Sequence, residues 1–177
     1  MITYKEYFMP IPISEVVDMP PMTHNQPTGQ VAKSPVIDNK KLTNAYIVAA
    51  TLFGEARSEG LTGMQAILNV IMNRAHGDFN NAAKVASKPK QFSCWNNINN
   101  KEEYANILAK KARSGELKDA NSYKSALMLV DKALKNNLPD ITGGAQFYFN
   151  PHKVHPRWAD KMTITVTLGN HEFYKLK

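Results

Sequence analysis

Apolar residues recur at every third or fourth position from Leu42 onward, which is the spacing of a helix that buries one face. The first stripe predicts a helix closed by Gly60, and it consists of Leu42, Ala45, Tyr46, Ala49, Leu52, Phe53 and Ala56. A second stripe predicts a helix with Thr62 as its N-cap that ends near Gly77, and its inward residues are Ala66, Ile67, Val70 and Ile71.

The remaining pattern predicts shorter elements. One helix covers 79–87 and stops before Pro89, and two more cover about 102–113 and 122–136. The stretch "KPKQFSCWNNINN" has no periodicity and predicts a loop. The segments "QFYFN" and "MTITVTLGNHEFYKL" are β-branched and aromatic, which predicts two or three short strands. The expected fold class is therefore α+β, mostly helical, with a small β element.

Residues 1–41 differ from the rest of the chain. They contain six of the ten prolines and show no helical period, so they predict an extended arm ahead of one domain over 42–177. The arm also carries Tyr4, Tyr7, Phe8, Ile11, Ile13, Val16 and Val17. A disordered tail and an arm that docks on a partner are both open at this point.

Charge and composition narrow the classes of function. The net charge of +7 is concentrated in 79–138, where eleven basic and five acidic side chains give +6. Such a segment attracts polyanions such as nucleic acid, an anionic glycan or a wall polymer, or it is a solvated face. No zinc-finger spacing or aromatic-basic strand favours nucleic acid, and no apolar run approaches the ~18 residues of a membrane span. The first residues carry no secretory signal pattern, so we expect no signal peptide.

Glu55 and Glu59 end the first stripe four residues apart, on one edge of the predicted helix. Their spacing fits either a helix running out into solvent or a carboxylate at the lip of a cleft. A rival chemistry is Cys94 as a nucleophile with His152, His155 or His171 as base, although the loop around Cys94 favours a packed thiol. A third possibility is a metal site formed by the two histidines of "HKVH" together with His171. Pro151 and Pro156, which flank "HKVH", make such a site less favourable.

Four blocks in order are similar to the cell wall hydrolase family of the spore cortex-lytic enzyme type (SleB and CwlJ). They are "LFGEARSEG", "GMQAILNVIMNRA", "KPKQFSCWN" and "PDITGGAQFYFNP…HPRWADKMTITVTLGNHEFYK". The resemblance implies a lysozyme-like fold that cuts peptidoglycan glycan strands between N-acetylmuramic acid and N-acetylglucosamine. It also implies that Glu55 is the catalytic acid. The family pattern does not extend to residues 1–41.

A carboxylic acid that protonates a glycosidic oxygen near neutral pH needs apolar surroundings, and Phe53 and Ala56 flank Glu55. Hydrolysis normally adds a second carboxylate, for which Asp78 and Asp140 are candidates only by their position in loops. A lytic transglycosylase needs none, because the sugar's own 6-hydroxyl attacks. We therefore expect a lytic transglycosylase, with a hydrolytic muramidase or a non-catalytic wall-binding module as alternatives.

The substrate-contacting residues we expect are Glu59, Gln91, Tyr148, Asn150 and Trp158, because glycans are held by aromatic faces and amide hydrogen bonds. Glu59 could also orient Glu55 electrostatically or raise its pKa by like-charge coupling, but the first expectation for it is a salt bridge with a basic residue such as Arg74. No cofactor or metal is expected, and neither nucleic acid nor membrane is expected as a partner. The arm and the missing signal suggest a phage lysin, located in the host cytoplasm or in a virion, with 1–41 docking on a phage structural protein.

Overall fold

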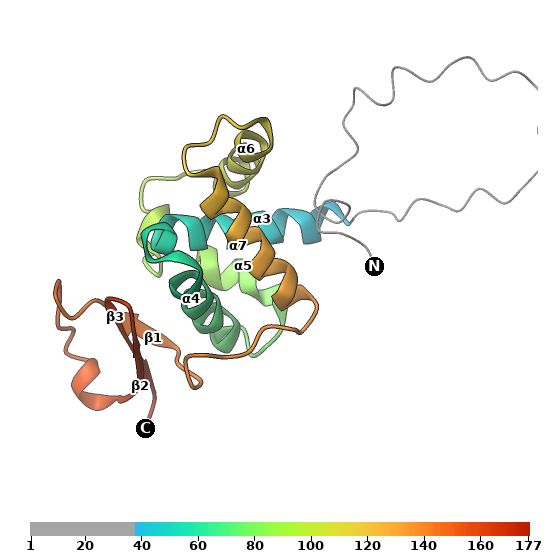
Figure 1. Ribbon diagram of the computed structural model, residues 1–177. Coiled ribbons are helices and arrows are strands. Elements are labelled where there is room, and N and C mark those ends of the chain that lie inside the picture. Colours follow the sequence, from blue (N-terminus) through green and yellow to red (C-terminus); the bar gives the residue numbers. More distant parts are fainter. Residues whose placement is uncertain (1–37) are drawn as a thin grey trace, which may run out of the picture. The chain divides into compact units, whose positions relative to one another are not determined.

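The structure is a computed structural model that describes residues 38–177, and within it Thr43–Lys177 form one compact unit (Figure 1). Helices come first and strands last along this unit. The helices are α3 (Asn39–Ala56), α4 (Gly60–Arg74), α5 (Phe79–Ser87), α6 (Lys101–Ser114) and α7 (Ala120–Leu134), with 3-10 turns η1 (Arg57–Glu59), η2 (Ser93–Trp95) and η3 (Ala159–Lys161). The strands are β1 (Phe147–Phe149), β2 (Thr163–Leu168) and β3 (His171–Lys175). The α+β, mostly helical prediction is confirmed.

Local signals explain most helix boundaries. Asp78 caps α5 by accepting the Asn80 backbone N–H at 2.9 Å, and the chain turns extended at Lys88 before Pro89. The predicted Thr62 cap is wrong, because α4 already starts at Gly60. Gly60 has φ +68°, a conformation that suits glycine, and it turns the chain directly from η1 into α4.

Three antiparallel strands in the order β1-β3-β2 make a sheet whose two faces have different neighbours. Tyr148 pairs with Phe173, and Phe173 packs on Ala66 and Val70 of α4. The alternate residues form an aromatic cluster on the other face, with Phe149 and Tyr174 as its buried members. Strand alternation therefore directs Tyr148 and His171 toward the helices.

Amide side chains of α4 hold the loop that leads into β1. Gln65 and Asn69 both donate to the carbonyl of Pro139, at 3.0 and 3.3 Å. One turn further on, Asn73 donates to the carbonyl of Ala145 at 2.9 Å. The three residues follow at four-residue spacing on one face of the helix, so they fix the start of β1 relative to α4.

Asp140 organises the same loop. Its carboxylate accepts the backbone N–H groups of Thr142 (2.7 Å) and Gly144 (2.8 Å), the Thr142 hydroxyl (2.6 Å) and the Asn73 amide (3.1 Å). Burial alone would raise the pKa of Asp140, but these hydrogen bonds together outweigh it and hold the pKa below its usual value.

We expect Asp140→Asn to lower the free energy of unfolding by about 1 kcal/mol at neutral pH, since an amide offers one acceptor oxygen where two are used and the site is exposed. The folded-state pKa is the lower one, so the stabilisation is present above about pH 4 and is lost as the pH falls through the folded-state value. Urea unfolding at about pH 7 and about pH 3 measures it. An equal difference between parent and variant at both pH values would contradict the assignment.

Candidate active site

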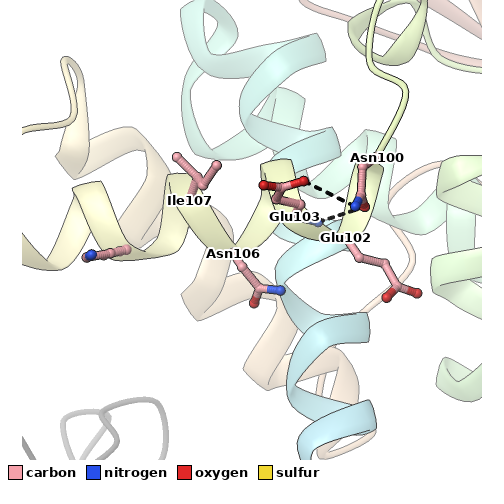
Figure 2. A pocket seen from close by; sticks show the side chains of 6 residues that line it. Asn100, Glu102, Glu103, Asn106 and Ile107 are labelled. Atoms are coloured by element: carbon pink, nitrogen blue, oxygen red, sulfur yellow. Dashed lines mark hydrogen bonds between the residues drawn. The ribbon is translucent and has the colours of Figure 1, made fainter.

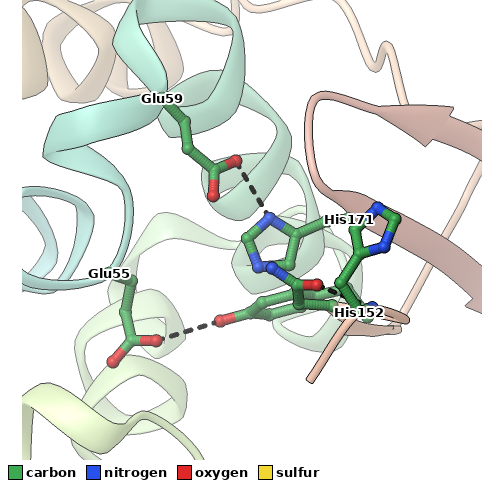
Figure 3. Close-up of polar contacts among 6 residues, drawn as sticks. Glu55, Glu59, His152 and His171 are labelled. Carbon is green, nitrogen blue, oxygen red and sulfur yellow. Dashed lines mark hydrogen bonds and ion pairs between the residues drawn. The ribbon is translucent and has the colours of Figure 1, made fainter. Parts of the chain in front are cut away.

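The half-buried carboxylate of Glu55, near the end of α3, is held by donors from two other segments. Its Oε1 accepts the backbone N–H of Cys94 at 2.8 Å and the hydroxyl of Ser93 at 3.1 Å. Its Oε2 accepts the hydroxyl of Tyr148 at 3.3 Å, the dashed line beside Glu55 in Figure 3. A backbone N–H can only donate, so Oε1 must stay an acceptor and an acidic proton belongs on Oε2.

Gly54 allows η2 to approach α3 this closely. A Cβ at Gly54 would lie 2.5 Å from the Cβ of Cys94 and 3.2 Å from its Sγ. Next to this contact, the indole N–H of Trp95 donates to the buried hydroxyl of Thr51 at 3.0 Å. The absence of a side chain at Gly54 therefore lets η2 lie close to α3, and η2 supplies the hydrogen bonds that position Glu55.

Tyr148 reaches Glu55 from the sheet. Its ring stacks on Phe173 (centroids 5.8 Å apart) and forms a T-shaped pair with the ring of His171 (centroids 5.3 Å apart). Burial raises the pKa of Tyr148 above its usual value and the Glu55 carboxylate raises it further, against a lowering effect of Arg74. The phenol therefore stays protonated and remains a hydrogen-bond donor to Glu55.

A pocket of about 380 Å³ opens beside Glu55. Its lining brings together residues from α3, α4, the loop around η2, and β1, namely Glu55, Arg74, Lys90, Gln91, Ser93, Asn96 and Tyr148. Glu55 is the single carboxylate among these described lining residues. The pocket thus combines one acid with amide, hydroxyl and cationic groups, a set suited to a polar, hydroxyl-rich ligand.

Arg74 forms one wall of this pocket. Its guanidinium donates to the carbonyl of Gln146 and, at 3.1 Å, to the side chain of Gln91, and it lies over the rings of Phe92 and Phe147. Burial lowers the pKa of Arg74 from its usual value. Arg74 therefore joins the loop before η2 to the start of β1, the two segments that carry the donors to Glu55.

Glu59 has a basic partner, as expected, but it is not Arg74, the residue named as the example. Glu59 Oε2 instead lies 2.9 Å from Nδ1 of His171, and Figure 3 shows the dashed line between these two residues. Arg74 donates its hydrogen bonds to Gln91 and Gln146. His171 lies 112 positions away along the chain, and strand alternation turns it toward the helices. No local spacing could reveal this pair.

Cys94 contributes its backbone rather than its thiol. Burial raises the pKa of the Cys94 thiol above its usual value, and the neighbouring Glu55 carboxylate raises it further. A protonated thiol is a poor nucleophile, so the structure disfavours the cysteine chemistry. Within 38–177 no group of three or more His, Cys, Asp or Glu side chains is arranged to hold a metal ion.

Three of the five predicted sugar contacts are not among the pocket's lining residues. Trp158 packs with Phe147, Phe149 and Tyr174 in the aromatic cluster, on the opposite face of the sheet from Tyr148. Asn150 uses its side-chain oxygen to accept the backbone N–H of His152 at 2.9 Å. Glu59 does not line the pocket either, whereas Gln91 and Tyr148 do.

The two candidates for a second carboxylate also have structural partners. Asp78 caps α5, and Asp140 holds the loop before β1. Neither lines the pocket at Glu55.

A second, larger hollow of about 500 Å³ runs along α6 (Figure 2). There Asn100 caps α6 by accepting the Glu103 backbone N–H at 3.1 Å, and its side-chain amide donates to the Glu103 carboxylate at 3.2 Å. Because these groups have a structural role, we assign the chemistry to the pocket at Glu55.

A comparison with protein families relates this site to known enzymes. The model of the family described as Cell Wall Hydrolase matches residues 58–174. The chain belongs to the Cell Wall Hydrolase family. It is therefore an enzyme of the SleB and CwlJ type that cleaves peptidoglycan, as the four sequence blocks predicted. The match begins three residues after Glu55, so the role of Glu55 rests on the site's geometry.

Among solved structures, the hydrolase is similar to the catalytic domain of the germination-specific lytic transglycosylase SleB from Bacillus anthracis. The TM-score is 0.50 at 23% identity, and the likeness covers 75% of this chain and 94% of that chain. At this identity the likeness shows a shared fold. No curated protein matches the chain.

Sequence reasoning missed several residues of the site. Ser93, Asn96 and Lys90 were seen only as members of the "KPKQFSCWN" block. Cys94 was considered only for its thiol, and His171 only as a base or a metal ligand, whereas the structure uses the Cys94 backbone N–H and pairs His171 with Glu59. The position of Phe92 and Trp95 in an aperiodic loop was the available signal, because two large aromatics there must pack on something. They pack as buried anchors, and the polar residues between and beside them face Glu55.

Proposed function

We propose that this cell wall hydrolase cuts peptidoglycan between N-acetylmuramic acid and N-acetylglucosamine as a lytic transglycosylase, with Glu55 as the only acid and base. The main support for this proposal is that the two oxygens of the Glu55 carboxylate have different hydrogen-bond partners. Oε1 is committed to Ser93 and Cys94, Oε2 lies on the Tyr148 side, and no other described carboxylate lines the pocket. The SleB domain with the similar fold is itself a lytic transglycosylase, which agrees with the proposal.

In the proposed reaction Glu55 Oε2 first gives its proton to the glycosidic oxygen as the bond from that oxygen to C1 of muramic acid breaks. The resulting carboxylate then takes the proton of the 6-hydroxyl of the same muramic acid residue. That hydroxyl oxygen bonds to C1 and closes a 1,6-anhydro ring. One proton leaves Glu55 and one returns, so no water is consumed and no second carboxylate is needed.

The remaining pocket residues fit the binding of such a substrate. Gln91 and Asn96 offer amides, and Arg74 and Lys90 offer donors that suit acetamido carbonyls or carboxylates. The phage origin, and the arm at 1–41 as a docking segment for a phage structural protein, remain proposals from the sequence alone.

Purified cell walls test the proposed function. We expect falling turbidity together with soluble fragments that end in 1,6-anhydro-muramic acid, one water lighter than reducing ends. Fragments with reducing muramic ends would identify a hydrolytic muramidase. Fragments freed only by peptide cleavage, or no loss of turbidity, would contradict glycan cleavage altogether.

A further inference from the structure

Glu59 and His171 form a pair next to the pocket, and both of their side chains are largely shielded from solvent. Their side chains are only 15% and 14% exposed, and the carboxylate oxygen lies 2.9 Å from Nδ1 of the imidazole. A carboxylate oxygen can only accept, so Nδ1 carries the hydrogen and donates it. This contact fixes which ring nitrogen is protonated and how the ring is oriented.

Two glycines next to Glu59 leave the space that its side chain occupies. A Cβ at Gly63 would lie 2.5 Å from the Cβ of Glu59 and 3.2 Å from its Oε2. A Cβ at Gly169, where φ is +58°, would lie 3.4 Å from the same oxygen. One glycine belongs to α4 and the other to the turn between β2 and β3, so both walls of the Glu59 site are closely packed.

The ring that Glu59 orients touches Tyr148. The rings of His171 and Tyr148 form a T-shaped pair with centroids 5.3 Å apart and planes at 77°, and the Tyr148 hydroxyl donates to Glu55 Oε2. We propose that Glu59 and His171 are positioning residues that set the Tyr148 hydroxyl against the proton-carrying oxygen of Glu55. This inference rests on the proposed function, and it replaces the predicted role of Glu59 as a sugar contact.

A purely structural role for the pair would be to join the β2–β3 hairpin to η1. Such a tether would affect folding and activity whether or not Tyr148 has its hydroxyl. A positioning role acts through that hydroxyl and is lost with it. The difference between the two roles is therefore measurable as coupling between Glu59 and Tyr148.

A double-mutant cycle makes the test on the full chain, with initial rates on a soluble glycan fragment of cell wall. We expect Glu59→Gln and Tyr148→Phe each to lower kcat about tenfold with KM unchanged, since each weakens one hydrogen-bonded contact. The double variant should match Tyr148→Phe alone within about a factor of two. Should Glu59→Gln fail to fold by circular dichroism, His171→Phe takes its place, because it keeps the ring and removes the Nδ1 donor.

Glu172→Gln is the matched control. It removes the same charge from the neighbouring strand position, where the carboxylate accepts the Tyr174 hydroxyl at 2.6 Å on the face away from the pocket, and its kcat should equal the parent's. Losses that multiply in the double variant, an unchanged kcat in Glu59→Gln, or a loss carried by KM would each overturn the positioning role. An inactive parent would instead overturn the proposed function, so the two failures are distinguishable.

Discussion

Replacing Glu55 with Gln should lower the rate of wall lysis at least about a thousandfold while leaving the fold intact. A glutamine keeps one oxygen to accept from Ser93 and Cys94, so the loop around η2 stays in place. Its amide group cannot release a proton to the glycosidic oxygen. The measurement is turbidity loss of purified walls, with thermal unfolding by circular dichroism to show that the variant is folded.

Two controls separate this expectation from general damage. Glu103→Gln changes the same group in the hollow along α6, where the carboxylate accepts the side-chain amide of the cap residue Asn100, and it should not change the lysis rate. Cys94→Ala keeps the backbone N–H that binds Glu55 and should remain active. Lysis that persists in Glu55→Gln but disappears in Cys94→Ala would show thiol chemistry and contradict the assignment.

Gly54→Ala should reduce activity about a hundredfold, the scale expected when a catalytic group is misplaced by about 1 Å. Alanine favours a helix over glycine by about 1 kcal/mol, so α3 itself should not be weakened. The new methyl group would, however, sit 2.5 Å from the Cβ of Cys94. Because that distance is too short for two carbons, η2 must move, and the 2.8 Å hydrogen bond to Glu55 should be lost.

A second substitution checks the cause. Cys94→Gly removes the atom that the new methyl group meets, so the double variant Gly54→Ala, Cys94→Gly should recover most of the lost rate. Cys94→Gly alone serves as the reference for the comparison. Full activity in Gly54→Ala, or no recovery in the double variant, would show that the close approach of η2 to α3 is not what positions Glu55.

The sequence predicted those parts of the fold that depend on neighbouring residues. The helix at 79–87 was placed correctly, with Pro89 marking its end in the sequence, and the structure shows Asp78 as the cap at its start. The start of α3 was missed by three residues, since Asp38 caps it ahead of the first apolar residue of the stripe. Gly60 was taken as the end of one helix, whereas it begins the next.

The sequence pointed to Glu55 as the candidate acid, but it did not reveal which residues contact the Glu55 carboxylate. Glu55 was found from its motif, but the donors that fix it come from Ser93, Cys94 and Tyr148, at least 38 positions away. A basic partner such as Arg74 was expected for Glu59, and the partner in the structure is His171 at the start of β3. Trp158 could not be separated from Tyr148 by residue type, since only its packing on Phe149 and Tyr174 shows that it lies on the opposite face of the sheet from Tyr148.

The central claim is that Glu55 alone serves as acid and base. Digestion of purified walls in water labelled with oxygen-18, followed by mass analysis of the new muramic acid ends, tests it most directly. We expect anhydro ends that carry no label, because the 6-hydroxyl of the sugar supplies the attacking oxygen. Labelled, reducing muramic ends would show that water attacks, and the single-carboxylate mechanism at Glu55 would then be wrong.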